Sequence, residues 1–176
     1  QDNKEIQIAL NHVRRFDARH QMLAKMIAEN TWGQTISARW VYYGGWFHTG
    51  VHVIDTLQML LGDTLQIKEV KSGFTDRAED PSLDLRMSLS NLPSIPILIE
   101  SFPESAFQLF EGEIRFQEGR IRFLNFGEEV YIEKARVNEI GERELGKAEL
   151  FAVGDAETPM EKLYNQAIRW LKNGDV

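Results

Sequence analysis

Cysteine is absent from this 176-residue sequence. Disulfide bridges, thiolate zinc sites and thiol nucleophiles are therefore excluded, although the absence does not identify the redox compartment. Proline is also scarce, with five residues, while hydrophobic residues make up 43% of the chain. This composition is sufficient to bury one ordinary hydrophobic core, so we expect residues 1–176 to form a single domain.

Positive charge and long apolar runs are also in short supply. The formal net charge of -7 argues against nucleic acid or an anionic membrane as the main partner, because both need a clustered positive field. No segment approaches the roughly 18 apolar residues of a membrane span, and residues 1–5 lack the apolar core of a signal peptide. We therefore expect a cytoplasmic protein. Because the chain starts without methionine, we interpret it as part of a longer protein.

The first third of the chain predicts alternating strands and helices. Residues 6–10 and 36–43 are rich in apolar, β-branched and aromatic residues, which is typical of strands. Asp17 is suited to cap a helix that follows it, and a second helix is expected over residues 49–61, with Gly62 as its stop.

The pattern changes to period two over residues 65–151, which predicts a run of strands. Segments 107–116 and 120–126 alternate apolar and charged residues on either side of a short turn, as in an antiparallel hairpin.

A last helix is predicted to begin within residues 158–161, where threonine and glutamate form a capping box and proline takes the first helical position. Its expected buried stripe consists of Leu163, Ala167, Trp170 and Leu171. Helices near both ends of the chain thus flank a large, mainly antiparallel open sheet, and we assign the α+β class.

The segment most suited to chemistry follows Gly44 and Gly45. At helical spacing, His48, His52 and Asp55 fall on one narrow stripe of the predicted helix. An imidazole can serve as acid or base near neutral pH, so one interpretation of this stripe is a site for proton transfer. The alternative is that these histidines are ordinary surface or capping residues.

A metal site is a second alternative, since two histidines four residues apart and a nearby carboxylate can hold a divalent ion. The zinc-protease pattern needs glutamate directly after the first histidine, where this chain has Thr49. We therefore predict no metal ligands.

Candidate substrate contacts lie on both sides of a predicted strand. Trp46, next to the glycine pair, offers an apolar platform for a sugar ring. His12, Arg14 and Arg15 lie before a predicted helix, where polar side chains can reach a cleft. Either arginine could bind a carboxylate or phosphate, and either could instead be an ordinary exposed residue at a helix start.

The order of motifs and expected elements resembles the C-terminal domain of the Gfo/Idh/MocA (glucose-fructose oxidoreductase / inositol dehydrogenase) oxidoreductases. This order is Arg-Arg-Phe-Asp, a helix, a strand, Gly-Gly-Trp, a helix with Gly-x-His-x-x-Asp, and an antiparallel sheet. The resemblance covers nearly the whole chain. In that family an N-terminal Rossmann domain binds NAD or NADP. The chain contains no Gly-x-Gly-x-x-Gly, so we expect that domain, and every cofactor-binding residue, to lie outside it.

The resemblance implies that His52 is the acid or base for a substrate hydroxyl. Many members carry aspartate four residues earlier, where this chain has His48, so the residues alone leave the orienting group of His52 open. The resemblance implies that the whole protein is a NAD(P)-dependent oxidoreductase acting on a sugar, polyol or sugar derivative, and that this chain alone is inactive. The resemblance also implies a homo-oligomer that forms through the sheet. The competing hypothesis is a non-catalytic binding or assembly module.

Overall fold

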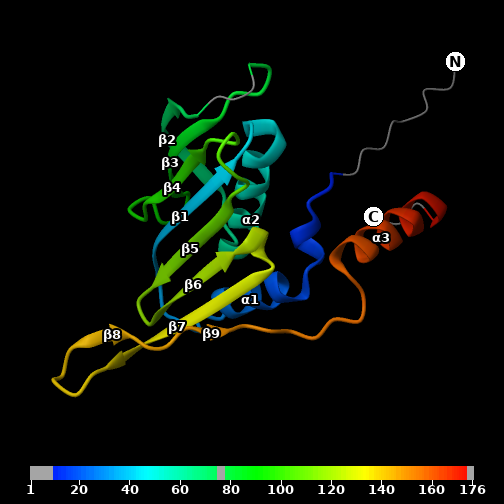
Figure 1. The fold of residues 1–176 in the computed structure, drawn as a ribbon. Coiled ribbons are helices and arrows are strands. Elements are labelled where there is room, and N and C mark those ends of the chain that lie inside the picture. The colour runs from blue at the N-terminus through cyan, green and yellow to red at the C-terminus, as the bar shows by residue number, and fades with distance from the viewer. Residues whose placement is uncertain (1–9, 75–77, 174–176) are drawn as a thin grey trace, which may run out of the picture.

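A wide sheet with helices on one face forms the body of the protein (Figure 1). The computed structural model describes residues 10–74 and 78–173 and confirms the α+β class. Its α-helices are α1 (Ala18–Ala28), α2 (Val51–Leu61) and α3 (Pro159–Asn173). Its short helical turns are η1 (Val13–Phe16), η2 (Trp46–Gly50) and η3 (Asn125–Gly127). Its strands are β1 (Thr35–Tyr43), β2 (Leu65–Ser72), β3 (Leu83–Leu89), β4 (Ile97–Phe102), β5 (Phe110–Phe116), β6 (Gly119–Leu124), β7 (Glu129–Val137), β8 (Arg143–Leu145) and β9 (Glu149–Leu150).

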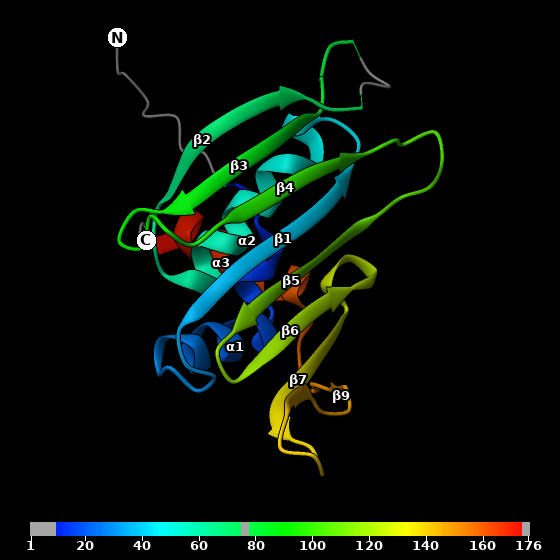
Figure 2. The same cartoon turned by 90° about the vertical axis from the view of Figure 1, so that its left-hand side faces the viewer.

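The nine strands of the described sheet run in the order β2-β3-β4-β1-β5-β6-β7-β8, with β9 also paired to β7. Among the described strand pairs, β1 and β4 are parallel and the others are antiparallel. The first strand of the sheet therefore lies at its centre, between strands that come much later in the chain. In Figure 2 the sheet faces the viewer and the helices lie behind it.

Alternation along the strands separates the two faces of the sheet. On β1, Ala38, Trp40 and Tyr42 are buried, whereas Arg39, between Ala38 and Trp40, is exposed. The predicted hairpin is confirmed as β5 and β6, in which Ile114 pairs with Ile121 and both are fully buried. The apolar sides of these strands form the core beneath α1 and α2.

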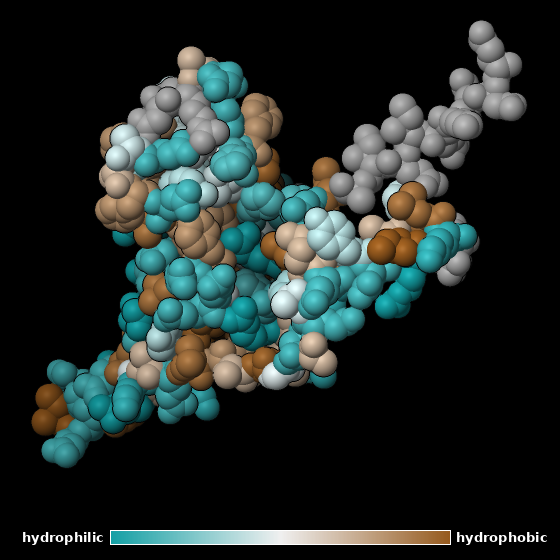
Figure 3. All heavy atoms as spheres, turned by 45° about the vertical axis from the view of Figure 1, so that its right-hand side comes forward, coloured by the Kyte–Doolittle hydropathy of each residue, from teal (hydrophilic) through white to brown (hydrophobic). Residues whose placement is uncertain are grey.

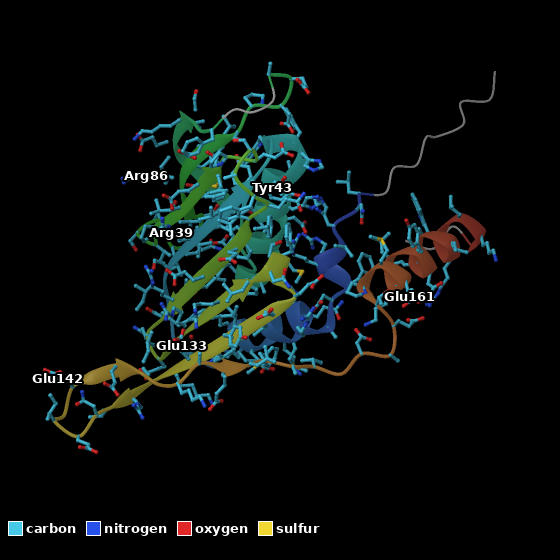
Figure 4. All side chains as sticks on the ribbon, in the orientation of Figure 1. Arg39, Tyr43, Arg86, Glu133, Glu142 and Glu161 are labelled. Carbon is cyan, nitrogen blue, oxygen red and sulfur yellow. The ribbon has the colours of Figure 1, made fainter. Side chains whose placement is uncertain are left out.

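The opposite face of the sheet carries ion pairs between neighbouring strands. Arg120 and Arg122 of β6 both bind Glu133 of β7, at 2.7 Å and 3.1 Å. Arg39 pairs with Glu100 across β1 and β4. Figure 4 shows Arg39 and Arg86 on the side of the sheet away from α1 and α2. No described helix covers this face, which we call the open face (Figure 2).

The expected helix ends are confirmed, with one difference at a start. The Asp17 carboxylate accepts hydrogen bonds from the backbone N–H groups of Arg19 and His20 and so caps α1. Gly62 ends α2 in the left-handed conformation, with φ of 62°. The predicted helix over residues 49–61 instead begins as the wider turn η2 and becomes α-helical at Val51.

The capping box of α3 is confirmed, but the prediction of a buried stripe was wrong. The Thr158 hydroxyl and Glu161 carboxylate exchange hydrogen bonds with each other's backbone N–H groups. Leu163, Ala167 and Trp170 are only partly buried, and Leu171 is 71% exposed. The helix packs against η1 and projects from the body, so the sheet does not cover its apolar residues.

Hydrophobic side chains are accordingly visible on α3 at the surface (Figure 3). None of the described helices is long and apolar enough to cross a bilayer. The predicted strand at residues 6–10 lies outside the described residues except for Leu10, which belongs to no helix or strand.

Candidate functional site

Two segments far apart in the sequence meet at the candidate site. The turn η1, with His12 directly before it, packs against α1, α2 and α3. The other segment is η2 with α2, which carries His52 and Asp55. The sequence predicted both as site segments, and the structure brings them together.

An open hollow of about 570 Å³ lies where the two segments meet. This is within the usual size of a site for a small ligand. Its described lining residues are Leu10, Asn11, His12, Trp46, Val51, His52, Ile54, Asp55 and Gln58. Four of the predicted site residues, His12, Trp46, His52 and Asp55, are therefore in the wall. Arg14, Arg15 and His48 are not among these lining residues.

His52 is half-buried in the wall of the hollow, and its ring packs edge-on against the ring of His12. The two ring centres are 5.5 Å apart, with an angle of 80° between the ring planes. Burial is the main reason that the pKa of His52 is lowered from its ordinary value, and electrostatic interactions with Arg14 and His12 add to this effect. Asp55 opposes the lowering, and His48 adds a smaller contribution to it. The neutral imidazole, which can accept a proton, is thus favoured at neutral pH.

Asp55 connects the two segments through its two carboxylate oxygens. Arg15 Nε donates a hydrogen bond of 2.7 Å to Asp55 Oδ1, and His12 Nδ1 lies 3.6 Å from Asp55 Oδ2. The Asp55 side chain is 11% exposed, whereas that of Arg15 is 49% exposed. Arg15 therefore approaches the site from solvent and fixes the carboxylate between η1 and α2.

Arg14 points away from the hollow and into the body. Its Nη2 donates a hydrogen bond of 2.9 Å to the carbonyl oxygen of Phe126, and its guanidinium carbon lies 4.1 Å from the centre of the Phe110 ring. Burial lowers the pKa of Arg14 to about 10, against the opposing effects of Asp17 and Asp55. The side chain remains charged at neutral pH, and these contacts give it a structural role.

His48 is exposed, and its backbone lies in the wide turn η2 and not in the α-helix α2 that carries His52 and Asp55. The backbone N–H groups of Phe47 and His48 donate to the two carboxylate oxygens of Asp80, at 2.8 Å and 2.9 Å. Because η2 is wider than an α-helix, His48 does not continue the regular spacing of His52 and Asp55. Phe47 beside it is 73% exposed.

Trp46 is partly buried and forms an apolar wall. Its ring packs edge-on against Tyr42, with ring centres 5.9 Å apart. A Cβ atom on Gly50 would lie 2.3 Å from Trp46 Cε3, so glycine is needed for the ring to lie this close to the start of α2. The indole is therefore held in place in the wall of the hollow that His52 also lines.

The helix start after Gly44 and Gly45 does not fit a dinucleotide phosphate. Diphosphate binding at such a turn uses free backbone N–H groups, but Asp80 already accepts from Phe47 and His48, and the carbonyl of Pro81 accepts from Trp46. A Cβ on Gly45 would lie 2.0 Å from the Asp80 carboxylate, so the glycine serves this internal contact. Within the described residues, no His, Asp and Glu side chains form a group of three that could hold a metal ion.

Sequence reasoning missed several residues of this region. Asp80 is 32 residues after His48 in the sequence, and no local pattern links the two. Gln58, one turn after Asp55 on α2, could have been found from its helical spacing. Asn11 and Leu10 line the hollow from a stretch without regular structure.

Comparison with known proteins finds similarity in structure and not in sequence. No protein-family model matches the chain, and no curated protein sequence matches it. The chain is similar to KijD10, a 3-ketoreductase from Actinomadura kijaniata in complex with NADP, with a TM-score of 0.69 and 14% sequence identity over 94% of this chain and 52% of that one. Another KijD10 structure, in complex with TDP-benzene and NADP, has a TM-score of 0.69 and 15% identity over 94% of this chain and 53% of that one.

Two further solved structures extend this similarity. The dehydrogenase MviM from Clostridium difficile gives a TM-score of 0.58 and 19% identity, over 93% of this chain and 53% of that one. An oxidoreductase from Sinorhizobium meliloti gives a TM-score of 0.64 and 10% identity, over 98% of this chain and 56% of that one. The chain thus spans about half the length of the structures it matches. At these identities the similarity shows a fold that occurs in oxidoreductases.

Proposed function

We propose that this chain is the substrate-binding, proton-transferring half of a NAD(P)-dependent oxidoreductase of the Gfo/Idh/MocA family. Its substrate would be a sugar, a polyol or a sugar derivative. The half-buried imidazole of His52, on the wall of an open hollow, is the observation on which this proposal rests. The fold shared with about half of several oxidoreductases supports it.

The chain's own contribution is to bind the substrate and move a proton. Oxidation of a carbon that bears a hydroxyl group releases a hydride and the hydroxyl proton. Neutral His52 is suited to accept that proton because its pKa is lowered by burial and by electrostatic interactions with Arg14 and His12. In the reverse reaction the protonated imidazole returns the proton to the carbonyl oxygen.

The composition of the hollow supports a polyhydroxylated substrate. Trp46, Val51 and Ile54 provide apolar surface, which suits the face of a sugar ring. Gln58, Asn11 and Asp55 provide hydrogen-bond donors and acceptors for hydroxyl groups.

Hydride transfer is the part of the chemistry that a nicotinamide nucleotide supplies. Since the turn after β1 is occupied by Asp80, the proposal assigns the cofactor to a part of the protein outside the described residues. The isolated 176-residue chain should therefore show no appreciable affinity for NAD or NADP in titration calorimetry. Micromolar binding by this chain would mean that the division into halves is wrong.

Steady-state kinetics of the protein that also contains the nucleotide-binding half test the catalytic assignment. With a panel of sugars and polyols, His52→Ala should lower the turnover by roughly two to four powers of ten, the range for loss of a general acid or base. Cofactor affinity should stay close to that of the unsubstituted protein. His48→Ala is the matched control, since this exposed histidine is outside the hollow, and it should cost less. Full turnover by His52→Ala would instead favour the non-catalytic assembly module.

A further inference from the structure

His52 has a close histidine neighbour that the sequence did not assign to it. The sequence left the orienting group of His52 open, with His48 four residues earlier, but His48 is exposed and is not among the described lining residues of the hollow. His12 instead packs its ring edge-on against that of His52, with 5.5 Å between the ring centres. The two imidazoles come from segments that only the folded structure brings together.

His12 is itself held at its far side. Its Nδ1 is buried, forms no hydrogen bond within the described part of the chain, and lies 3.6 Å from Asp55 Oδ2. The other oxygen of that carboxylate is fixed by Arg15 Nε at 2.7 Å. Arg15, Asp55, His12 and His52 thus form one continuous chain of contacts from solvent to the wall of the hollow.

We propose that His12, anchored by Asp55 and Arg15, is the residue that positions and tunes His52. The role in proton transfer rests on the proposed function, whereas the coupling between the two rings is a property of this chain alone. His12 acts here through another residue, and it is therefore a positioning residue.

The unsatisfied contact between His12 and Asp55 gives the physical reason. The 3.6 Å between His12 Nδ1 and Asp55 Oδ2 is too long for a hydrogen bond between neutral His12 and the carboxylate. Because Nδ1 is buried, leaving it without a hydrogen bond costs free energy. A second proton on His12 converts the contact into an ion pair with the carboxylate. His12 thus lies between the Asp55 carboxylate and the ring of His52, so any positive charge that it carries is next to that ring.

Positive charge on His12 disfavours a proton on His52. Four charged or titratable groups among the described residues act on His52. His12 and Arg14 come from the segment before α1, Asp55 comes from α2 and His48 comes from η2. Arg14, His12 and His48 lower the pKa of His52, and Asp55 raises it. His12 therefore helps to keep His52 in the neutral form, while edge-on packing limits the rotation of its ring.

NMR titration of the 176-residue chain tests the coupling without any need for enzyme activity. The chain has four histidines, so single substitutions assign each imidazole resonance. His12→Phe keeps an aromatic ring but removes the charge, and it should raise the titration midpoint of His52 by about half a pH unit or more. His12→Gln, which keeps a polar side chain of smaller size, should shift the midpoint in the same direction. Asp55→Asn should lower it, because the group that favours the proton is lost.

His48→Phe is the matched control, and it should shift the His52 midpoint less than His12→Phe does. An unchanged midpoint in both His12 variants, or a larger shift in His48→Phe than in His12→Phe, would overturn the proposal. Because these readouts do not use turnover, failure of the oxidoreductase assignment is seen separately, as full activity of His52→Ala in the complete protein. If that assignment holds, His12→Phe should also move the acidic limb of the kcat/KM profile for oxidation to higher pH.

Discussion

Arg14 lies over the ring of Phe110, with its guanidinium carbon 4.1 Å from the ring centre. The same guanidinium donates to the carbonyl of Phe126, a residue with φ of 60° in the turn η3. A bulky residue rarely adopts this left-handed conformation, so the turn needs contacts of this kind to hold it.

Arg14→Leu should therefore lower the free energy of unfolding by about 1–3 kcal/mol, through loss of the cation–π contact and of a partly buried hydrogen bond. Urea denaturation monitored by circular dichroism measures the change. Arg136→Leu removes an exposed arginine that pairs with Glu144 and should cost no more than about 0.5 kcal/mol. Equal losses in the two variants would contradict the structural role of Arg14.

Asp17 should make the stability of the fold depend on pH. Burial alone would raise the pKa of Asp17, but hydrogen bonds from His20 and Arg19 outweigh it and hold the pKa well below its ordinary value. A carboxylate with a lowered pKa in the folded state stabilises the fold above its unfolded pKa of about 3.9, and this contribution is lost as the pH falls below that value.

Asp17→Asn should consequently reduce the stability at neutral pH and flatten its decline between about pH 5 and pH 3. Urea unfolding across this range measures both effects. Glu139→Gln, at an exposed position, should keep the decline of the unsubstituted chain. A decline that is as steep in Asp17→Asn as in the unsubstituted chain would show that other groups cause it.

Gly112 on β5 should tolerate no side chain. A Cβ atom there would lie 2.1 Å from Cε3 of Trp40, and Trp40 is fully buried. Gly112→Ala should lower the free energy of unfolding by about 1–3 kcal/mol, because the core must shift to admit the methyl group. Gly154→Ala, where nothing lies within 4 Å of the added atom, should stay within about 0.5 kcal/mol. Thermal unfolding of each variant measures the difference in stability. Equal melting temperatures of the two variants would contradict the close packing of Gly112 against Trp40.

The open face should mediate self-association, as the family resemblance implies. It carries charged side chains of both signs in cross-strand pairs, so two copies can meet with complementary charges. We expect dimers or larger oligomers in sedimentation velocity at tens of micromolar, and we expect them to weaken at high salt.

Arg39→Glu should weaken this association, because it places a third acidic group beside Glu100 and Glu113. Lys25→Glu makes the same change of charge in an exposed ion pair on α1, behind the sheet, and should leave association unchanged. A strictly monomeric chain, or equal effects of the two substitutions, would exclude the open face as the contact surface.

Local signals in the sequence predicted much of the fold. The period-two pattern of the hairpin, the cap at Asp17 and the stop at Gly62 depend on neighbouring residues, and each is confirmed. The parallel pairing of β1 with β4 could not be predicted in this way, since it depends on packing between segments far apart in the chain. The burial of α3 was predicted wrongly because an amphipathic pattern identifies an apolar side without identifying what covers it.

The candidate site was predicted as separate residues and not as an arrangement. His52 and Asp55 share α2, so helical spacing related them correctly. The contacts of His12 and Arg15 with this pair depend on how η1 packs against α2, and spacing carries no information on that. The contacts of Asp80 with Gly45, Phe47 and His48 join distant segments at the wider turn η2, so spacing along the chain could not predict them either.

The central position of β1 also determines when the sheet can form during synthesis. This strand is translated before its two neighbours, β4 and β5, which are complete only at residues 102 and 116. Until then both edges of β1 have unpaired backbone groups next to the apolar side chains of Trp40 and Tyr42, a state prone to aggregation. Pairing between such distant segments also slows folding. A nascent chain that stalls before residue 116 is therefore a natural substrate for chaperones that bind exposed strands.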